Sequence, residues 1–185
     1  MMEGVEKEVN VLIVEDDKYI SNFICMSLKQ EGYHYLKADT GREAIGLSYA
    51  NNPDVVILDL GLPDMDGMEV IEHIRSNSDK PIIVVSARQE ETEKIKALDL
   101  GADDYVEKPF AMAVMLAKIK AQLRRGYEMQ EERNVLKDDD LLVDIERRNV
   151  TLKGKQLALS VKEFELLVLL LRKRHTTLRK DYIFS

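Results

Sequence analysis

Four short apolar runs of the sequence end on polar side chains that could take part in phosphoryl transfer. The first run leads into Glu15 and Asp16, the second into Asp59, the third into Ser86 and the fourth into Lys108. Short runs rich in Val and Ile, separated by segments with helical periodicity, are typical of buried parallel strands. Because ligands of open parallel sheets gather at the carboxyl ends of the strands, we expect these side chains to converge.

Such a set of side chains would suit a magnesium ion and a phosphoryl group. Mg²⁺ prefers hard oxygen ligands and keeps several waters, so carboxylates beside a hydroxyl and an ammonium group match its needs. A single Asp after a strand is more often a turn or helix-cap residue. That structural explanation is much weaker for four strand ends together than for one. Lys108 also precedes Pro109, and a cis bond there would turn the lysine toward the carboxylates.

The same positions resemble those of a known family, the receiver domains of two-component response regulators. The matching segments are VLIVEDD at residues 11–17, LDL at 58–60, LPDMDG at 62–67, SAR at 86–88, GADDY at 101–105 and KPF at 108–110. The resemblance covers residues 9–125, which we predict to be a receiver (response regulatory) domain.

Some segments are similar to one class within that family. GADDY followed by KPF is most similar to the OmpR/PhoB class of transcription factors. The stretch LGLPD at residues 60–64, together with SAR, is similar to the KdpE branch, which regulates potassium-transport operons. The sequence therefore predicts a response regulator that controls transcription, with potassium-transport genes as its targets.

The resemblance implies a role for each strand-end residue. Asp59 would be the nucleophile that accepts a phosphoryl group from a sensor histidine kinase. Glu15, Asp16, Asp59 and the backbone carbonyl of Gly61 would hold Mg²⁺, directly or through water, and Lys108 would balance the added charge. Because such catalysis consists mostly of positioning and electrostatics, the protein would be a phosphoacceptor that assists its own phosphorylation and dephosphorylation, and not an enzyme with turnover.

Two further residues would carry the switch that follows phosphorylation. The resemblance implies that Ser86 donates its hydroxyl to a phosphoryl oxygen and pulls the following loop inward. Tyr105 would then move from an exposed to a buried position. A purely structural alternative stays open for both residues, in which Ser86 only caps the next helix and Tyr105 is only a half-buried strand aromatic.

Phosphorylation would be read out by homodimerisation. The resemblance places the dimer face on the fourth helix, fifth strand and fifth helix, with charged contacts across a two-fold axis. The candidate residues are Lys94, Asp99, Asp104, Lys118 and Lys120, with Asp99 paired to Lys120 and Asp104 to Lys118. Val114 stands where an acid commonly faces the basic residue at position 94, so one contact would be lost. Alternatively these charges are simply solvated, since surface ion pairs contribute only about 0 to 1 kcal/mol each.

Helical and strand patterns alternate through the first part of the chain. We predict strands at residues 11–14, 33–38, 55–58, 82–85 and 105–107 and helices at 18–30, 41–50, 68–77, 90–100 and 111–125. This alternation predicts an α/β fold with a parallel sheet covered on both faces. The receiver resemblance implies a flavodoxin-like (βα)5 domain with strand order 2-1-3-4-5.

A second, smaller domain is expected after a break in the pattern. We interpret residues 126–137 as a linker or an overrun of the fifth helix. Within residues 138–185, short strands at 141–143, 149–152 and 156–159 and a turn at 153–155 indicate an antiparallel meander. A capping box then begins a helix at Ser160, ahead of the apolar stripe Phe164, Leu167, Val168 and Leu171. The pattern resembles the front of the OmpR/PhoB winged-helix domain, an α+β fold that is incomplete here.

The family pattern continues beyond that helix through a recognition helix, for which residues 178–185 leave no room. Base contacts supply sequence specificity. We therefore expect promoter DNA to be a partner of a full-length form, and no family-like operator affinity for residues 1–185. A stand-alone receiver that signals by protein contacts alone stays open as an alternative. A phosphatase of the haloacid dehalogenase type needs a second Asp two residues after the nucleophile, where Gly61 stands.

The charge and composition of the sequence indicate which partners and which compartment suit the protein. The net charge of -7 is uneven, since residues 1–135 carry 16 basic and 26 acidic side chains and residues 136–185 carry 11 and 8. An acidic front suits a cation site and a mildly basic back suits a phosphate backbone. The longest apolar stretch near the end, residues 166–171, is far shorter than the ~18 residues of a membrane span. We expect a cytoplasmic protein without a membrane partner, in which Cys25 is a buried structural thiol.

Overall fold

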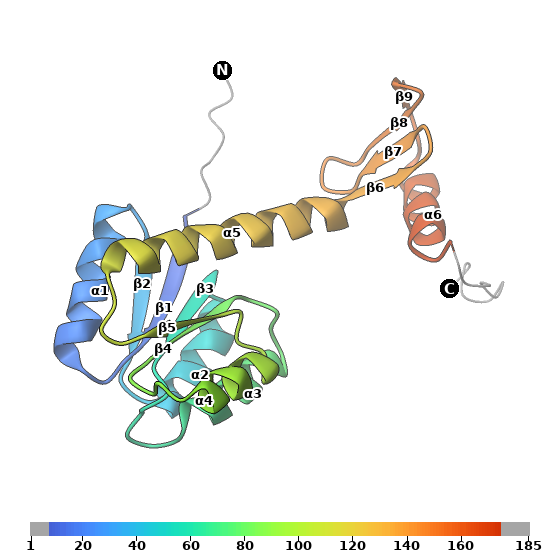
Figure 1. Cartoon of the computed structure of the whole chain (residues 1–185). Helices are drawn as coiled ribbons and strands as arrows, with labels where there is room; N and C mark the ends of the chain where they lie inside the picture. The colour runs from blue at the N-terminus through green and yellow to red at the C-terminus, as the bar shows by residue number, and fades with distance from the viewer. Residues whose placement is uncertain (1–7, 175–185) are drawn as a thin grey trace. The chain divides into compact units, whose positions relative to one another are not determined.

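The computed structural model of the chain describes residues 8–174, apart from the side chains of residues 131–133. The chain divides after Gly126 into two compact units, which are described separately below. Figure 1 shows the helices and strands of both units. The end of the predicted second domain, residues 175–185, lies outside the described residues.

The first unit is built on a parallel sheet. Its five strands are β1 (Asn10–Val14), β2 (His34–Ala38), β3 (Val55–Leu58), β4 (Ile82–Ser86) and β5 (Asp104–Glu107). They lie in the order β2-β1-β3-β4-β5, with every neighbouring pair parallel. The predicted flavodoxin-like order is therefore confirmed, and the carboxyl ends of β1, β3, β4 and β5 lie at one edge of the sheet.

Helices cover both faces of this sheet. They are α1 (Lys18–Gln30), α2 (Gly41–Asn51), α3 (Gly67–Arg75), α4 (Glu91–Asp99) and α5 (Met112–Asn134). Strand residues such as Leu12 and Val14 pack with side chains of α2, α3 and α4. Their alternates Val11 and Ile13 pack with α1 and the first half of α5. β1, β3 and β4 are apolar at nearly every position because both of their faces are buried.

Helix starts in the first unit are fixed by short polar side chains. Asp17 caps α1 and accepts hydrogen bonds from the N–H groups of Tyr19 and Ile20. Thr40 caps α2 and Asp66 caps α3. Each side chain satisfies backbone donors that the first turn of a helix leaves without an internal partner. The expected burial of Cys25 is confirmed, and burial raises the pKa of its thiol.

As far as the structure describes it, to residue 174, the second unit is an antiparallel sheet with one helix. Its strands are β6 (Val135–Asp138), β7 (Leu141–Asp144), β8 (Asn149–Leu152) and β9 (Lys155–Leu157), paired in sequential order. Helix α6 (Val161–Arg172) begins with the predicted capping box, in which the Ser160 N–H donates to Glu163 Oε2 at 2.7 Å. Val143, Val150 and Phe164 form the buried centre. This sheet and helix agree with the expected incomplete C-terminal domain.

Residues 126–137, predicted as a linker or an overrun of the fifth helix, continue α5 as far as Asn134 and then begin β6. The strand is too short and too polar at its end to be recognised from periodicity alone. It is defined by its pairing with β7, where Val135 lies opposite Asp144 and Asp138 lies opposite Leu141.

Among the described helices, none is long and apolar enough to cross a membrane.

Candidate functional site

The carboxyl edge of the parallel sheet brings together side chains from three of its strand ends. Glu15 follows β1, Asp59 follows β3, and Lys108 follows β5. The Lys108 ammonium lies between the two carboxylates, with Nζ 2.7 Å from Glu15 Oε2 and 3.0 Å from Asp59 Oδ2. The Lys108–Pro109 bond is cis. One cation therefore bridges residues that are 93 and 49 positions away in the sequence.

A third carboxylate completes a set of oxygen ligands. Glu15, Asp16 and Asp59 each offer an oxygen atom, and these atoms all lie within 4.8 Å of one another. Glu15 and Asp59 are buried, whereas Asp16 is exposed, which leaves one side of the cluster open to water. Mg²⁺ is usually bound by a few carboxylates and several waters. The donor set present in the structure therefore fits that ion.

The charges of the site depend on one another. Burial raises the pKa of Glu15, the Lys108 hydrogen bond lowers it in part, and the neighbouring Asp59 carboxylate raises it further. Burial by itself disfavours the charged form of Lys108, but its bonds to Glu15 and Asp59 outweigh that effect and raise its pKa. The ammonium stays charged and offsets the repulsion between the two carboxylates.

The loop after β3 holds Asp59 in place. The Gly61 N–H donates to Asp59 Oδ1 at 3.2 Å, which orients the carboxylate. At the other end of the loop, the backbone of Asp66 pairs with Gly61 in an isolated antiparallel β-bridge. The Asp66 side chain accepts the Met68 N–H at 2.9 Å. The N–H of Gly61 thus forms a hydrogen bond with the site. Ligation of a metal by the Gly61 carbonyl stays a prediction.

Sequence reasoning gave no role to Asp64, which fixes the middle of the same loop. Its two carboxylate oxygens accept the N–H groups of Gly41 and Arg42 at 2.8 and 3.0 Å. These hydrogen bonds lower the pKa of Asp64. The contact joins the loop after β3 to the start of α2. The motif LPDMDG contains Asp64, but only the folded chain shows which helix start it contacts.

Ser86 and Tyr105 both contact the backbone of Arg88. Ser86 is buried, and its Oγ accepts the Arg88 N–H at 3.1 Å. The N-cap of α4 is Glu90, so Ser86 does not cap that helix. The Tyr105 hydroxyl donates to the Arg88 carbonyl at 2.9 Å, and its side chain is buried. Tyr105 therefore occupies the inward position in this structure.

The charged residues on α4, β5 and α5 pair within the chain. Lys118 Nζ lies 2.8 Å from Asp104 Oδ1, while Lys120 pairs with Glu31 of α1 at 2.6 Å. Lys94 lies 3.6 Å from Glu107 and 5.8 Å from the centroid of the Tyr105 ring. Asp104 and Lys118 are thus brought together within one copy of the chain. For Asp99 and Lys120, the structure shows no such pair among the described residues.

Comparisons with known proteins agree with this geometry. The family model for the response regulator receiver domain matches residues 11–120. Response regulator ArlR of Staphylococcus haemolyticus is 34% identical over 176 residues, which cover 95% of this chain and 78% of ArlR.

Solved structures are similar over either the first unit or most of the chain. The Francisella response regulator 1452 receiver domain has a TM-score of 0.62 and 32% identity, covering 64% of this chain and 99% of its own. DrrB of Thermotoga maritima, an OmpR/PhoB homolog, has a TM-score of 0.58 and 29% identity, covering 95% of this chain and 78% of its own. The fold, the acidic cluster and these similarities lead to one conclusion. The chain belongs to the response regulators, and its first unit is a response regulator receiver domain.

Proposed function

We propose that this response regulator accepts a phosphoryl group from a sensor histidine kinase on Asp59, in a reaction that depends on Mg²⁺. The observation that carries the proposal is the position of Lys108 Nζ, 2.7 Å from Glu15 and 3.0 Å from Asp59. Asp16 lies beside this pair and completes the carboxylate set. The arrangement provides a nucleophile, a fixed cation and metal ligands in one place.

The residues of the site would each perform one task. An oxygen of Asp59 forms a bond to phosphorus as the N–P bond of the phosphohistidine breaks, and the imidazole leaves with the electron pair. The Gly61 N–H holds the carboxylate in orientation, and Lys108 offsets the charge that arrives. A bound Mg²⁺ would neutralise phosphoryl oxygens, with Glu15, Asp16, Asp59 and the Gly61 carbonyl as its protein ligands. Positioning and charge are what phosphoryl transfer mostly needs.

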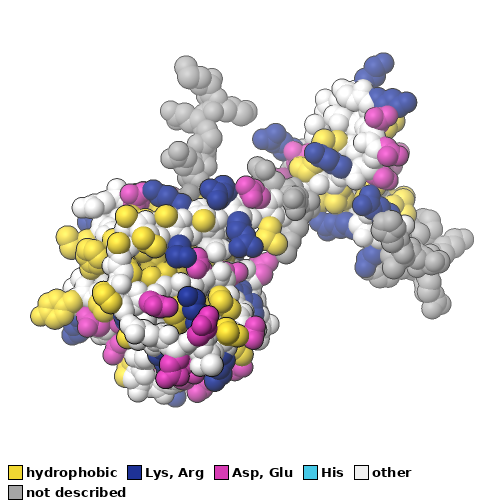
Figure 2. Space-filling view, viewed as in Figure 1, with side chains coloured by type: hydrophobic (Ala, Val, Ile, Leu, Met, Phe, Trp, Pro, Cys, Tyr) yellow, Lys and Arg dark blue, Asp and Glu magenta, His cyan; other side chains and the backbone are white. Residues whose placement is uncertain are grey.

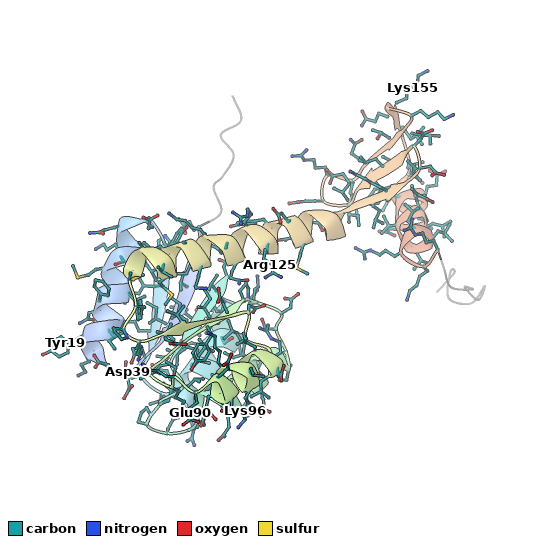
Figure 3. The ribbon with its side chains drawn as sticks, in the orientation of Figure 1. Tyr19, Asp39, Glu90, Lys96, Arg125 and Lys155 are labelled. Carbon is teal, nitrogen blue, oxygen red and sulfur yellow. The ribbon has the colours of Figure 1, made fainter. Side chains whose placement is uncertain are left out.

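An apolar groove beside Lys108 supports a protein partner as the phosphoryl donor. The groove has a volume of about 360 Å³ and is lined by Ile20, Phe23, Lys108, Pro109 and Phe110. Tyr19, next to it on α1, is 90% exposed and points away from the unit in Figure 3. An exposed apolar groove that includes the lysine bound to Asp59 fits docking of a protein better than entry of a small solute. We assign it to the kinase.

The proposal includes homodimerisation of the phosphorylated form through α4, β5 and α5. Figure 2 shows acidic, basic and hydrophobic side chains mixed on the face where these elements lie. Ile95, Leu98 and Val114 are exposed there, close in sequence to Asp99, Asp104, Lys118 and Lys120. Lys118 already pairs with Asp104 inside one chain. In a dimer, Lys118 and Asp104 would therefore exchange or share the ion pair that they already form within one chain. Most of the binding free energy of the dimer would come from Ile95, Leu98 and Val114.

Light scattering tests the dimer. Beryllofluoride with Mg²⁺, a phosphate mimic, should raise the apparent mass of the full chain toward twice its value. Ile95→Lys should prevent this change because it places a charge among the apolar residues of the face. Met26→Lys, at another exposed apolar position, on α1, is the control and should dimerise normally. A mass that stays monomeric with saturating mimic would contradict the proposed readout.

The role in transcription rests on the second unit and on the relatives. The antiparallel sheet and α6 agree with the start of a winged-helix domain, and DrrB is described as an OmpR/PhoB homolog. We place the receiver at residues 9–125 and the effector region at 138–185. We further propose that the regulator controls potassium-transport genes, because its segments LGLPD and SAR are similar to those of the KdpE branch. Promoter DNA would be the partner of the full-length regulator.

Intact-mass analysis tests the phosphoacceptor. Acetyl phosphate or a phosphorylated kinase, with Mg²⁺, should add one phosphoryl group to the chain. Asp59→Asn should abolish the adduct, and Asp39→Asn, a change at an exposed residue, should leave it intact. An adduct that persists in Asp59→Asn would overturn the assignment.

A further inference from the structure

The loop between β4 and α4 is fixed by the side chain of one residue, Arg88. Its Nη1 donates to Glu93 Oε2 at 2.8 Å, in the first turn of α4. Its Nη2 donates to Asp66 Oδ2 at 3.0 Å, and Asp66 is the N-cap of α3. Nη2 also lies 3.4 Å from the carbonyl oxygen of Leu60, the neighbour of Asp59. The guanidinium therefore joins the loop to two helix starts and to the backbone beside Asp59.

The backbone of the same residue contacts both candidate switch residues. The Arg88 N–H donates to Ser86 Oγ at 3.1 Å. The Arg88 carbonyl accepts the Tyr105 hydroxyl at 2.9 Å. A serine hydroxyl that accepts one hydrogen bond keeps its own hydrogen for another partner. With Arg88 in this position, Ser86 can donate to a phosphoryl oxygen while Tyr105 remains inward.

We propose that Arg88 is a positioning residue that holds the loop after β4, Ser86 and Tyr105 in an arrangement that can receive a phosphoryl group on Asp59. The inference rests on the proposed phosphorylation of Asp59. The three side chains that make these contacts, those of Arg88, Asp66 and Glu93, are together termed the Arg88 latch. The latch lowers the cost of binding a phosphoryl group or its mimic because the competent conformation is already populated.

The chemistry of the latch agrees with this role. Arginine presents a planar fork of donors in fixed directions, so that one nitrogen faces Glu93 while the other faces Asp66 and the Leu60 carbonyl. Burial by itself disfavours the charged guanidinium, but the bonds to Asp66 and Glu93 outweigh it and raise the pKa of Arg88. The side chains of Arg88, Asp66 and Glu93 are 33%, 41% and 30% exposed. Solvent therefore screens these pairs, and we expect a modest shift of population rather than a locked state.

Three variants separate the latch from the rest of the site. Arg88→Ala removes the fork. Asp66→Asn removes the carboxylate oxygen that faces Arg88 but retains an oxygen to cap α3, since Asn is as good a cap as Asp. Arg42→Ala is the matched control, because it also removes one arginine while its backbone bond to Asp64 is kept. Asp66→Asn thus keeps the inference testable even if Arg88→Ala fails to fold.

Calorimetric titration of the full chain with beryllofluoride and Mg²⁺ gives the first readout. Arg88→Ala and Asp66→Asn should each weaken apparent affinity by about three- to tenfold, and Arg42→Ala should not change it. The double variant Arg88→Ala/Asp66→Asn should be no weaker than the more affected single variant, because both remove the same contact. Unchanged affinity in both single variants would overturn the inference, as would additive effects in the double variant.

The ring signal of Tyr105 gives a second readout, which a merely stabilising role would not move. The chain has 7 tyrosines, so the signal is identified by its loss in Tyr105→Phe after carbon-13 labelling of tyrosine. Without the mimic, the wild-type signal should lie near its mimic-bound position, and Arg88→Ala should displace it. If wild-type protein fails to bind the mimic, the proposed function fails, but this signal still tests the latch. A signal identical in wild type and Arg88→Ala would overturn the latch.

Discussion

At the scale of single residues, two neighbouring carboxylates after β1 have different contacts. Asp16 lies with Glu15 and Asp59 in the cluster of oxygen ligands. Asp17 instead turns its side chain to the start of α1, where it accepts the Tyr19 N–H at 2.8 Å and the Ile20 N–H at 3.1 Å. The residue types alone do not show this division, because both residues are equally suited to a cap and to a metal; only the receiver resemblance singles out Asp16 as a metal ligand.

The division predicts opposite results for two equivalent substitutions. Asp16→Asn should weaken Mg²⁺ binding by about tenfold or more, since a charged ligand is lost from a site that relies on few protein oxygens. Asp17→Asn should leave the affinity unchanged, because Asn caps a helix as well as Asp does. Calorimetric titration with MgCl₂ measures both. Equal affinities of Asp16→Asn and wild type would remove Asp16 from the metal site.

Other residues of the site region could not be assigned from the sequence. Glu15, Asp59 and Lys108 follow apolar runs, so their convergence follows from the topology of a parallel sheet. Asp64 and Arg88 instead act through contacts with residues 22 or more positions away, Arg42 and Asp66. No local periodicity encodes such pairs. They depend on how the loops after β3 and β4 lie against each other.

At the scale of elements, the central strands were the most predictable part of the fold. β1 and β3 are buried on both faces, which requires continuous apolar runs and separates them clearly from amphipathic helices. A helix start was predictable from its cap at Ser160, where the capping box is present. The end of α5 was not, because residues 126–134 carry no strong stop signal.

The start of α3 is an element whose position depends on a glycine. A Cβ added at Gly67 would lie 2.5 Å from the Leu60 Cα and 2.7 Å from the Asp59 carbonyl oxygen, both backbone atoms. Gly67→Ala should therefore destabilise the receiver by about 1–3 kcal/mol and weaken mimic binding, because the strand end that carries Asp59 must move. Urea unfolding and calorimetric titration measure the two effects.

Gly46 supplies the control for that substitution. It lies within α2, and a Cβ there would meet no atom within 4 Å. Gly46→Ala should be neutral or stabilise the protein by about 0.5–1 kcal/mol, since alanine loses less conformational entropy in a helix. If Gly67→Ala and Gly46→Ala had the same effect on stability, close packing of α3 against β3 would not govern the site.

At the scale of the whole molecule, each unit has a hydrophobic core of its own. In the first unit, apolar side chains pack on both faces of the sheet. The second unit has a small core around Val143, Val150 and Phe164. The charge of the sequence is also uneven, with a change a few residues after the boundary between the units. Residues 1–135 carry a clear excess of acidic side chains, and residues 136–185 a small basic excess. The side chains of the proposed phosphorylation site, Glu15, Asp16, Asp59 and Lys108, all lie in the first unit.

This separation predicts that damage to the second core spares the site. Phe164→Ala should destabilise the second unit by about 3–5 kcal/mol, the usual cost of truncating a buried Phe. Hydrogen exchange should rise in β7, β8 and α6, while Mg²⁺ affinity stays that of wild type. Leu166→Ala, at a partly exposed position on the same helix, should change exchange little. Loss of Mg²⁺ binding in Phe164→Ala would contradict the separation.

The central claim is that the Asp59 carboxylate becomes an acyl phosphate, and chemical trapping tests it most directly. The full chain would be phosphorylated with acetyl phosphate and Mg²⁺ and then treated with labelled borohydride, whose hydride reduces an acyl phosphate to an alcohol and releases phosphate. Peptide mapping should find homoserine at position 59, dependent on Mg²⁺ and absent from Asp59→Asn. Label at another carboxylate, or no label in protein whose mass shows the adduct, would contradict the account.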